Sequence, residues 1–381
     1  MRILYINQTS IHGGAEEILL HVMTGIIGKG HNPFLIVPST GWLTDKCTTA
    51  GIPYKLVPTI PTHTTRNAAE QSRNVFLNNL SLSGITKQLR ADVIHVNSPR
   101  LAYHAGLAAI MTRRPLIVHV HDIVDSPYLS CLKSIYLSIV SSATIPVSDA
   151  VKDVVCSEHS QPDTTRIYNG VDLSIYHNIN CKDVRPSYGI NEEDLLIGSI
   201  SAMTPWKGQD TLIQAFPEVL KEFPHAKLLI GGGARNHPEE RKHENTLKQM
   251  CRQLIPEDKV VFTGWTEKAV EIIKSVDIFV HTPTRPDPFP TVIIHAMSLG
   301  KAIIASKTGG IPEMTCESEG AVLVEPGNAT ALSRAMLELS RDAKRRNAIA
   351  ESALSLSFRF NKQRMVDEVI GVYNRLGHQT G

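Results

Sequence analysis

One stretch of the sequence, residues 276–310, has the residue types and order of an anion-binding site. It opens with VDIFVH, an apolar, β-branched run that predicts a strand buried on both faces, and AIIAS at 302–306 predicts another. Between them lies TPTRPDPFP, with four prolines in nine residues, and then an apolar helix from Thr291 that Gly300 ends. A loop that leads into a helix N-terminus offers unpaired amides and a positive dipole end, so the stretch predicts a site for an anion.

Two other predicted loops carry residues that suit a phosphate group. Lys207 is followed by Gly208 and an amphipathic helical segment, TLIQAFPEVLKEF. A lone loop lysine is usually solvated, but a lysine beside a glycine and ahead of a helix favours a phosphate role. Gly13 and Gly14 follow the strand RILYI and precede a helix that we expect to run to about Gly28. Adjacent glycines let the backbone approach a ligand, although the pattern alone is explained better by a tight turn.

Two histidines mark the end of the predicted strand PLIVHV. His119 and His121 lie two residues apart, so their side chains share one face of that strand. Open α/β sheets bind ligands at the carboxyl ends of their strands, which makes both residues candidates for a site. A metal pair would need a clear third ligand, which the sequence does not supply, so we expect no metal.

Composition excludes several classes of protein. The 381 residues allow two or three domains, and a formal charge of +2 with no Lys/Arg-rich run gives no sign of a nucleic acid partner. Six scattered cysteines without a C-x-x-C pair favour reduced thiols. The N-terminus shows no secretory leader, and no apolar run approaches the ~20 residues that span a bilayer. We expect a soluble, cytoplasmic protein that could touch the inner membrane face only peripherally.

Strands and helices alternate along the whole chain, which predicts an α/β protein with parallel, helix-covered sheets. A polar segment with Pro186 and Gly189 predicts a linker, so we place one domain at 1–176 and a second at 190–360. We read 58–73 as a surface loop leading into a helix, with Arg66 and Arg73 as candidates for meeting an anionic acceptor.

Several segments resemble those of retaining glycosyltransferases of family 4, whose GT-B architecture has two Rossmann-like domains facing across a cleft. The family segment E-P-F-P-x-V-x-x-E-A-M-A-x-G, followed by G-G-x-P-E, corresponds to residues 287–300 and 309–313. Further matches, in the same order along the chain, are GGAE (13–16), HVHD (119–122), IYNGVD (167–172), PWKGQD (205–210), FTGW (262–265) and AVLVEPGN (321–328). By analogy, the helix at 361–381 packs back on the first domain.

The resemblance implies transfer of a sugar from a nucleotide-diphosphate sugar to a hydroxyl of a glycan, lipid-linked or small-molecule acceptor. It implies that Lys207 neutralises the diphosphate, that Asp287 accepts hydrogen bonds from the sugar, and that His121 lies near the transferred sugar, oriented by Asp122. The first domain would take the acceptor and the second the donor. No D-x-D motif occurs, so no metal cofactor is expected. The residues assigned to the nucleotide-sugar site are Gly13, Gly14, Lys207, Gly264, Phe289, Thr291, His295, Gly309 and Gly310.

Two departures from the family pattern keep other functions open. Ala202 stands where the family has a phosphate-binding arginine, for which Arg285 is a candidate substitute, and His295 replaces the second glutamate, which holds the donor ribose. His295 is either a weaker ribose ligand or a histidine packed in the domain. The favoured function is an active glycosyltransferase. The alternatives are a catalytically weak homologue that acts as a partner subunit in glycan assembly, and another GT-B enzyme such as a sugar-nucleotide epimerase.

Overall fold

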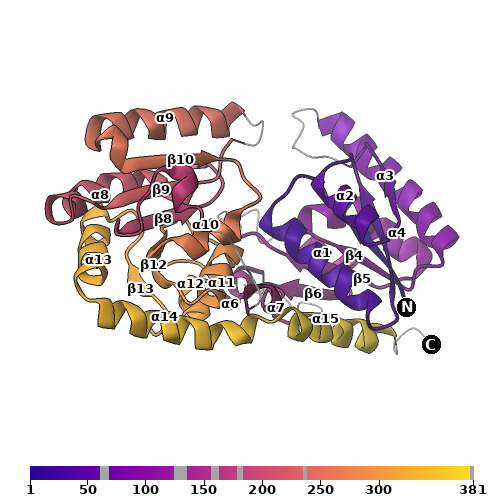
Figure 1. Ribbon diagram of the computed structural model, residues 1–381. Helices are drawn as coiled ribbons and strands as arrows, with labels where there is room; N and C mark the ends of the chain where they lie inside the picture. The colour runs from indigo at the N-terminus through magenta and orange to yellow at the C-terminus, as the bar shows by residue number, and fades with distance from the viewer. Residues whose placement is uncertain (61–67, 124–134, 156–162, 178–182, 235–237, 378–381) are drawn as a thin grey trace. The chain divides into compact units, whose positions relative to one another are not determined.

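The computed structural model describes residues 1–60, 68–123, 135–155, 163–177, 183–234 and 238–377 (Figure 1). The chain divides into two compact units. The first comprises Met1–Asp172 and Phe360–Gly381, and the second comprises Leu173–Arg359. Residues 173–189, which we had assigned to the end of the first domain and to a linker, therefore belong to the second unit.

The first unit is built on a seven-stranded parallel sheet in the order β3-β2-β1-β4-β5-β6-β7. The order reverses between β1 and β4, and such reversals are where open α/β sheets bind ligands. The predicted α/β class is confirmed. The strands are β1 (Arg2–Ile6), β2 (Asn32–Val37), β3 (Tyr54–Leu56), β4 (Val93–Val96), β5 (Leu116–Val120), β6 (Ala143–Pro146) and β7 (Asp163–Thr164).

Helices connect these strands and cover the sheet. Ser148 precedes α6, and its Oγ accepts a hydrogen bond from the N–H of Val151 at 3.1 Å, which caps the helix. One prediction is wrong: α3 already begins at Ala68, so Arg73 lies in a helix and not in a loop, while Arg66 falls outside the described residues. The helices are α1 (Gly14–Ile27), α2 (Trp42–Thr49), α3 (Ala68–Leu89), α4 (Pro99–Thr112), α6 (Asp149–Val155) and α15 (Lys362–Gly377).

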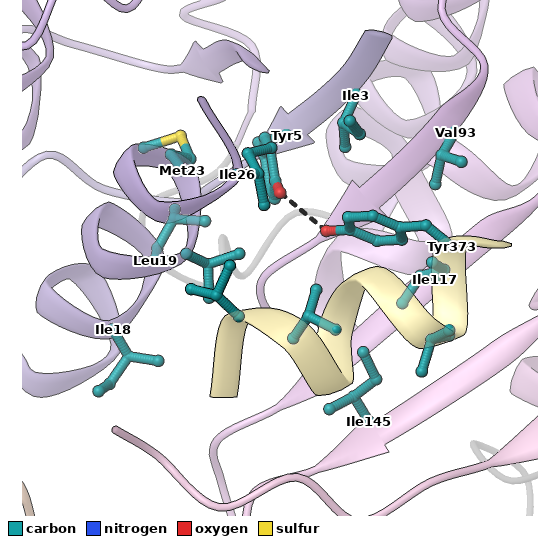
Figure 2. Close-up of a cluster of buried hydrophobic side chains, with 14 of the residues drawn as sticks. Ile3, Tyr5, Ile18, Leu19, Met23, Ile26, Val93, Ile117, Ile145 and Tyr373 are labelled. Atoms are coloured by element: carbon teal, nitrogen blue, oxygen red, sulfur yellow. Dashed lines mark hydrogen bonds between the residues drawn. The ribbon is translucent and has the colours of Figure 1, made fainter. Parts of the chain in front are cut away.

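The last helix, α15, completes the core of the first unit. Its apolar face, which includes Met365, Val369 and Tyr373, packs with residues of β1 and α1 in one buried cluster (Figure 2). The hydroxyls of Tyr5 and Tyr373 lie 2.7 Å apart, and the Tyr373 hydroxyl is also 2.7 Å from Nδ1 of His95. Because buried polar groups need partners, this chain of three side chains specifies where α15 docks.

The second unit has a six-stranded parallel sheet in the order β10-β9-β8-β11-β12-β13. Here the order reverses between β8 and β11, so the loops after these two strands lie at the reversal. The apolar run VDIFVH forms β11, as predicted, and the apolar runs LLIGSIS and AKLLIG form the two strands next to it. The strands are β8 (Leu196–Ile200), β9 (Lys227–Gly231), β10 (Val260–Gly264), β11 (Ile278–His281), β12 (Ala302–Ser306) and β13 (Val322–Val324).

The helix after the proline-rich loop, α11, is buried on most of its surface and packs against α14. It ends before Gly300, whose φ of 60° favours glycine. None of the helices in the described part of the chain is long and apolar enough to cross a membrane. The helices of this unit are α7 (Ser174–His177), α8 (Gln209–Glu222), α9 (Pro238–Leu254), α10 (Ala269–Ser275), α11 (Thr291–Ser298), α12 (Ile311–Met314), α13 (Ala329–Arg341) and α14 (Ala343–Ser357), with short 3₁₀ turns at Arg185–Tyr188, Pro205–Lys207 and Glu257–Lys259.

Candidate functional site

In the second unit, the loops that follow β8 and β11 lie directly against each other. Gly208 has a φ of 72°, and a Cβ at this position would stand 1.8 Å from the carbonyl oxygen of Thr282. The N–H of Thr284 donates to the carbonyl oxygen of Trp206 at 2.8 Å. Only glycine allows the first approach, so Gly208 brings Lys207 to the proline-rich loop.

Three side chains from these loops form a buried charged cluster. Nζ of Lys207 donates to Oδ2 of Asp287 at 2.5 Å, and Nε2 of His281 lies 3.1 Å from the same oxygen. The side chains of Lys207, Asp287 and His281 are 15%, 6% and 1% exposed. Nζ of Lys207 also lies 4.0 Å from the ring centroid of Trp206, which adds a cation–π contact. The sequence predicted the lysine and the aspartate as site residues; the structure joins them.

The cluster has a defined protonation state at neutral pH. Burial by itself would raise the pKa of Asp287, but the charge of Lys207 and the hydrogen bond from His281 lower this pKa to about 2. Burial lowers the pKa of His281, against the opposing effect of Asp287. The carboxylate is therefore charged and the imidazole neutral, so Lys207 and Asp287 balance each other's charge. Since a carboxylate only accepts hydrogen bonds, Nε2 of His281 carries the ring proton.

Gly309 and Gly310 hold the proline-rich loop in place. A Cβ on Gly309 would stand 2.1 Å from the carbonyl oxygen of Asp287, and one on Gly310 would stand 2.2 Å from that of Pro288. The N–H of Gly310 donates to the carbonyl oxygen of Asp287 at 2.9 Å. The resemblance assigned both glycines to the donor, but in this structure the Gly310 amide serves the loop itself.

The start of α11 carries two more predicted site residues, Phe289 and Thr291, which are 4% and 9% exposed. Pro290 is the N-cap residue, and it supplies no side-chain hydrogen bond to the first turn. The helix begins where it was predicted, beside the Asp287 cluster in the sequence.

His295, in the middle of α11, is buried and forms a hydrogen bond with a tyrosine that was not predicted from the sequence. The hydroxyl of Tyr176 lies 2.5 Å from Nδ1 of His295, and the His295 residue is 6% exposed. Burial lowers the pKa of His295 to about 4, so the ring is neutral at physiological pH. A ring packed in this way agrees with the packing interpretation.

The remaining positions of the second unit lie near the same edge of its sheet. Gly264 ends β10 with a φ of 68°, and a Cβ on Gly233 would stand 2.3 Å from the backbone nitrogen of Trp265, so the loops after β9 and β10 touch. The carbonyl oxygen of Ala202 accepts a hydrogen bond from Gln209 Nε2 at 2.9 Å. Arg285, the candidate substitute for the missing arginine, is exposed.

In the first unit, a chain of hydrogen bonds links the predicted glycine loop to His121. Nε2 of His121 is 3.0 Å from Oδ1 of Asn97, and Nδ2 of Asn97 donates to Oδ1 of Asn7 at 3.0 Å. Nδ2 of Asn7 donates in turn to Oε1 of Glu16 at 3.0 Å. Asn7, Asn97 and His121 follow β1, β4 and β5, so the chain crosses the reversal point of the sheet. Gly13 and Gly14 stand at the start of α1, one helical turn before Glu16 and Glu17.

The chain defines the tautomer of His121. Nδ2 of Asn97 also donates to the carbonyl oxygen of Ala15 at 3.3 Å, which assigns the amide orientation and makes Oδ1 the acceptor toward His121. His121 therefore carries its proton on Nε2, and Nδ1 holds a lone pair. Burial lowers the pKa of His121 to about 3, so the ring is a hydrogen-bond partner and a poor proton acceptor at neutral pH. Asp122, proposed to orient it, is exposed.

The two histidines predicted to share a face do so. The ring centroids of His119 and His121 lie 4.2 Å apart, and those of His95 and His119 lie 5.4 Å apart. Burial lowers the pKa of His95 to about 3 and that of His119 further. Within the described residues, no group of three or more His, Cys, Asp or Glu side chains has the arrangement of a metal site.

Comparison with known proteins identifies two family models along the chain. The model "Glycosyltransferase Family 4" matches residues 12–175, and "Glycosyl transferases group 1" matches residues 181–355. The matches fall on the two units in turn. Together they include every predicted site residue.

Two curated relatives match the chain over about half of their own length. N-acetyl-alpha-D-glucosaminyl L-malate synthase of Bacillus anthracis is 26% identical over 55% of this chain and 53% of its own. The GDP-mannose-dependent monoacylated alpha-(1-6)-phosphatidylinositol monomannoside mannosyltransferase of Corynebacterium glutamicum is 30% identical over 50% of each chain. The structure resembles Anabaena Alr3699/HepE in complex with UDP and glucose, with a TM-score of 0.85, 24% identity, and coverage of 98% and 100% of the two chains. The predicted GT-B fold is confirmed.

Removing Lys207 should destabilise the second unit. In Lys207→Met the His281 hydrogen bond is the only one that the described residues leave to the buried Asp287 carboxylate, and loss of one partner of a buried pair costs about 3 kcal/mol of unfolding free energy. In the double variant Lys207→Met/Asp287→Asn no charge is left unpaired, so most of that loss should be recovered. Urea denaturation at pH 7 measures both. Lys221→Met is the control, since its pair with Glu218 is 71% and 52% exposed and should change stability by less than about 0.5 kcal/mol. Equal stability of Lys207→Met and the control would contradict the conclusion that the Lys207–Asp287 pair stabilises the second unit.

The variant His295→Glu separates the two interpretations of His295. We expect a lower melting temperature, because a carboxylate replaces a buried neutral ring and Tyr176 supplies only one donor. His295→Gln is the matched neutral control, and should melt close to the wild type. Because the His295 pKa is about 4, nucleotide affinity measured by calorimetry should be flat between pH 6 and 8 as far as this residue contributes. Tighter nucleotide binding by His295→Glu without loss of stability would instead support a ribose contact.

Proposed function

This chain belongs to glycosyltransferase family 4, and from that membership we propose that it transfers a sugar from a nucleotide-diphosphate sugar to an acceptor hydroxyl, with retention at the anomeric carbon. The observation that carries the proposal is the buried cluster of Lys207, Asp287 and His281 at the reversal point of the second sheet. It places a cation and a carboxylate together where open sheets bind ligands, and α11 begins four residues after Asp287.

The cluster suits the charge changes of sugar transfer. Cleavage of the bond between the anomeric carbon and the phosphate leaves negative charge on the diphosphate and positive character on the sugar ring. Lys207 and the N-terminus of α11 would stabilise the leaving diphosphate, which removes part of the barrier. Asp287 would accept a hydrogen bond from a sugar hydroxyl and orient the ring. The positive charge of Lys207 would be shared between the diphosphate and Asp287, because Asp287 already pairs with Lys207 in this structure.

The acceptor's proton needs a base, and the leaving phosphate is the group that we propose for it. The acceptor oxygen forms its bond to the anomeric carbon on the face from which the phosphate departs, and its proton passes to a phosphate oxygen. This step keeps the anomeric configuration. His121 is unsuited to taking that proton, since burial lowers its pKa to about 3, and we propose that its Nδ1 accepts a hydrogen bond from a sugar hydroxyl.

A second candidate function is a catalytically weak homologue that binds a nucleotide sugar or a partner in glycan assembly. Ala202 lacks the guanidinium of the family arginine, and the carbonyl oxygen of Ala202 is bonded to Gln209. His295 offers no carboxylate. Both features reduce donor contacts and leave the cluster intact, so binding without turnover would be their expected effect.

Calorimetry and a hydrolysis assay test the proposal. UDP and GDP are titrated first, and UDP-glucose and GDP-mannose are then incubated with the enzyme, since relatives name both bases. We expect one nucleotide to bind, its sugar to be released, and Asp287→Asn to slow release at least ~10-fold, which corresponds to the loss of about 1.4 kcal/mol of transition-state stabilisation. Asp258→Asn, a surface change, is the control and should have no effect. Binding without release would favour the weak homologue, and no binding of either nucleotide would refute the donor assignment.

We also propose a peripheral membrane contact through the first unit. Helices α3 and α4 pack side by side (Figure 1), and residues 135–140 are helical. Arg113 and Arg114 lie in a hollow that Ile110 and Ile139 also line, so basic and apolar groups meet there. Acidic lipid headgroups suit such a surface. The large exposed apolar side chains of these helices are Phe76, Leu77, Leu80, Leu107, Ile110, Met111, Ile135 and Ile139.

Vesicle flotation tests this contact. The protein should float with phosphatidylglycerol vesicles more than with phosphatidylcholine vesicles, and Ile110→Gln/Ile139→Gln should reduce flotation several-fold. Leu254→Gln, at an apolar position on α9 that is 44% exposed, is the control. Flotation that is equal for the two lipids, or unchanged in the double variant, would contradict the proposal.

A further inference from the structure

His281 has a polar ring where the fold needs only an apolar one. It is the last residue of β11, its side chain is 1% exposed, and the three residues before it in the strand are apolar and buried. One ring nitrogen, Nε2, bonds to Asp287. The other, Nδ1, is buried without a hydrogen-bond partner among the described residues. An unpaired buried nitrogen costs stability, so packing alone does not account for the imidazole.

The two carboxylate oxygens of Asp287 differ in the hydrogen bonds that they accept. Lys207 and His281 both reach Oδ2, at 2.5 and 3.1 Å. No described residue donates a hydrogen bond to Oδ1. The carboxylate therefore has one oxygen held by two donors and one oxygen whose accepting capacity is unused by the part of the chain that the structure describes.

Two donors hold a carboxylate better than one. A lysine bound to a carboxylate is a mobile point charge on a flexible stem, so it can follow either oxygen as the group rotates. The His281 ring extends from a paired strand and donates along a fixed direction. Because the ring is neutral, it adds this restraint without adding a second positive charge that would bind an anion by itself.

We propose that His281 is a positioning residue, which together with Lys207 fixes Oδ2 of Asp287 and thereby presents Oδ1 to a hydroxyl of the donor sugar. The inference rests on the proposed function, because it assumes a nucleotide-sugar donor at this site. It goes beyond that function by naming the oxygen that meets the sugar and the residue that orients it.

Two variants of similar size test the restraint. In His281→Gln the side-chain amide reaches the place of Nε2 and can still donate to Oδ2. In His281→Asn the shorter amide falls near the place of Nδ1 and cannot. The measured quantity is the ratio of the dissociation constants of UDP and UDP-glucose, or of GDP and GDP-mannose if the wild type binds guanine nucleotides. This ratio isolates the contribution of the sugar.

We expect His281→Asn to reduce this ratio about 5–10-fold, as for loss of one well-placed hydrogen bond, while the dissociation constant of the nucleotide itself changes less than ~2-fold. His281→Gln should retain the ratio within ~2-fold. A purely structural role would lower the melting temperature and weaken nucleotide and nucleotide sugar equally. An unchanged ratio in His281→Asn would overturn the inference and leave the proposed function standing.

A second measurement needs no ligand. The ¹⁵N histidine spectrum of the wild type at pH 7, with the His281 signals assigned by their absence in His281→Gln, reports which ring nitrogen carries the proton. The Nε2-protonated neutral tautomer is expected. Protonation on Nδ1 alone would overturn the inference whatever binds at the site. If the wild type binds neither UDP nor GDP, the proposed function fails and the sugar contact fails with it.

Discussion

The ion pair between Lys207 and Asp287 is the interaction on which the second unit's site depends. It connects the loops after β8 and β11, and the close approach of Gly208 to Thr282 and the packing of Gly309 on the Asp287 backbone both serve to make it. A buried pair of this kind stabilises only when both partners are present and satisfied. The site is therefore neutral before a donor arrives, and a diphosphate would compete with Asp287 for the lysine. Any donor that binds must therefore supply a new hydrogen-bonding group to the Asp287 carboxylate, such as a sugar hydroxyl.

The two units use the same position in their sheets in different ways. Each places its polar residues where the strand order reverses. In the second unit the result is a charged cluster with a neutral histidine, whereas in the first a chain of amides runs from Glu16 to His121. Burial disfavours protonation of both His121 and His281, so neither ring adds positive charge at physiological pH. Their chemistry is that of oriented hydrogen bonds.

Much of this architecture could be predicted because the relevant signals are local. Buried parallel strands have continuous apolar runs, and the prolines at 282–290 and Gly300 bracket α11. Lys207 was identified from the glycine and helix that follow it, and Asp287 through the resemblance, but their mutual contact was not predicted, because it joins residues 80 positions apart. His281, Asn7 and Tyr176 were missed for the same reason: a single polar residue at a strand end or in a short helix gains meaning only from its partner. The domain boundary was misplaced because α7 lies in a polar segment whose composition resembles a linker.

The docking of α15 on the first unit has a consequence for how the chain is made. The hydrophobic core around Tyr5 is incomplete until residues Met365–Leu376 of α15 have been synthesised, although β1 to β7 are synthesised long before. Translation of residues 173–359 takes roughly 10–40 s at typical rates of elongation. During that interval the nascent first unit exposes the apolar groove that α15 later fills, whereas the second unit, being continuous in sequence, can fold as it emerges from the ribosome. The first unit is therefore synthesised first but completed last. Chaperones would have to protect its exposed apolar groove until α15 has been synthesised.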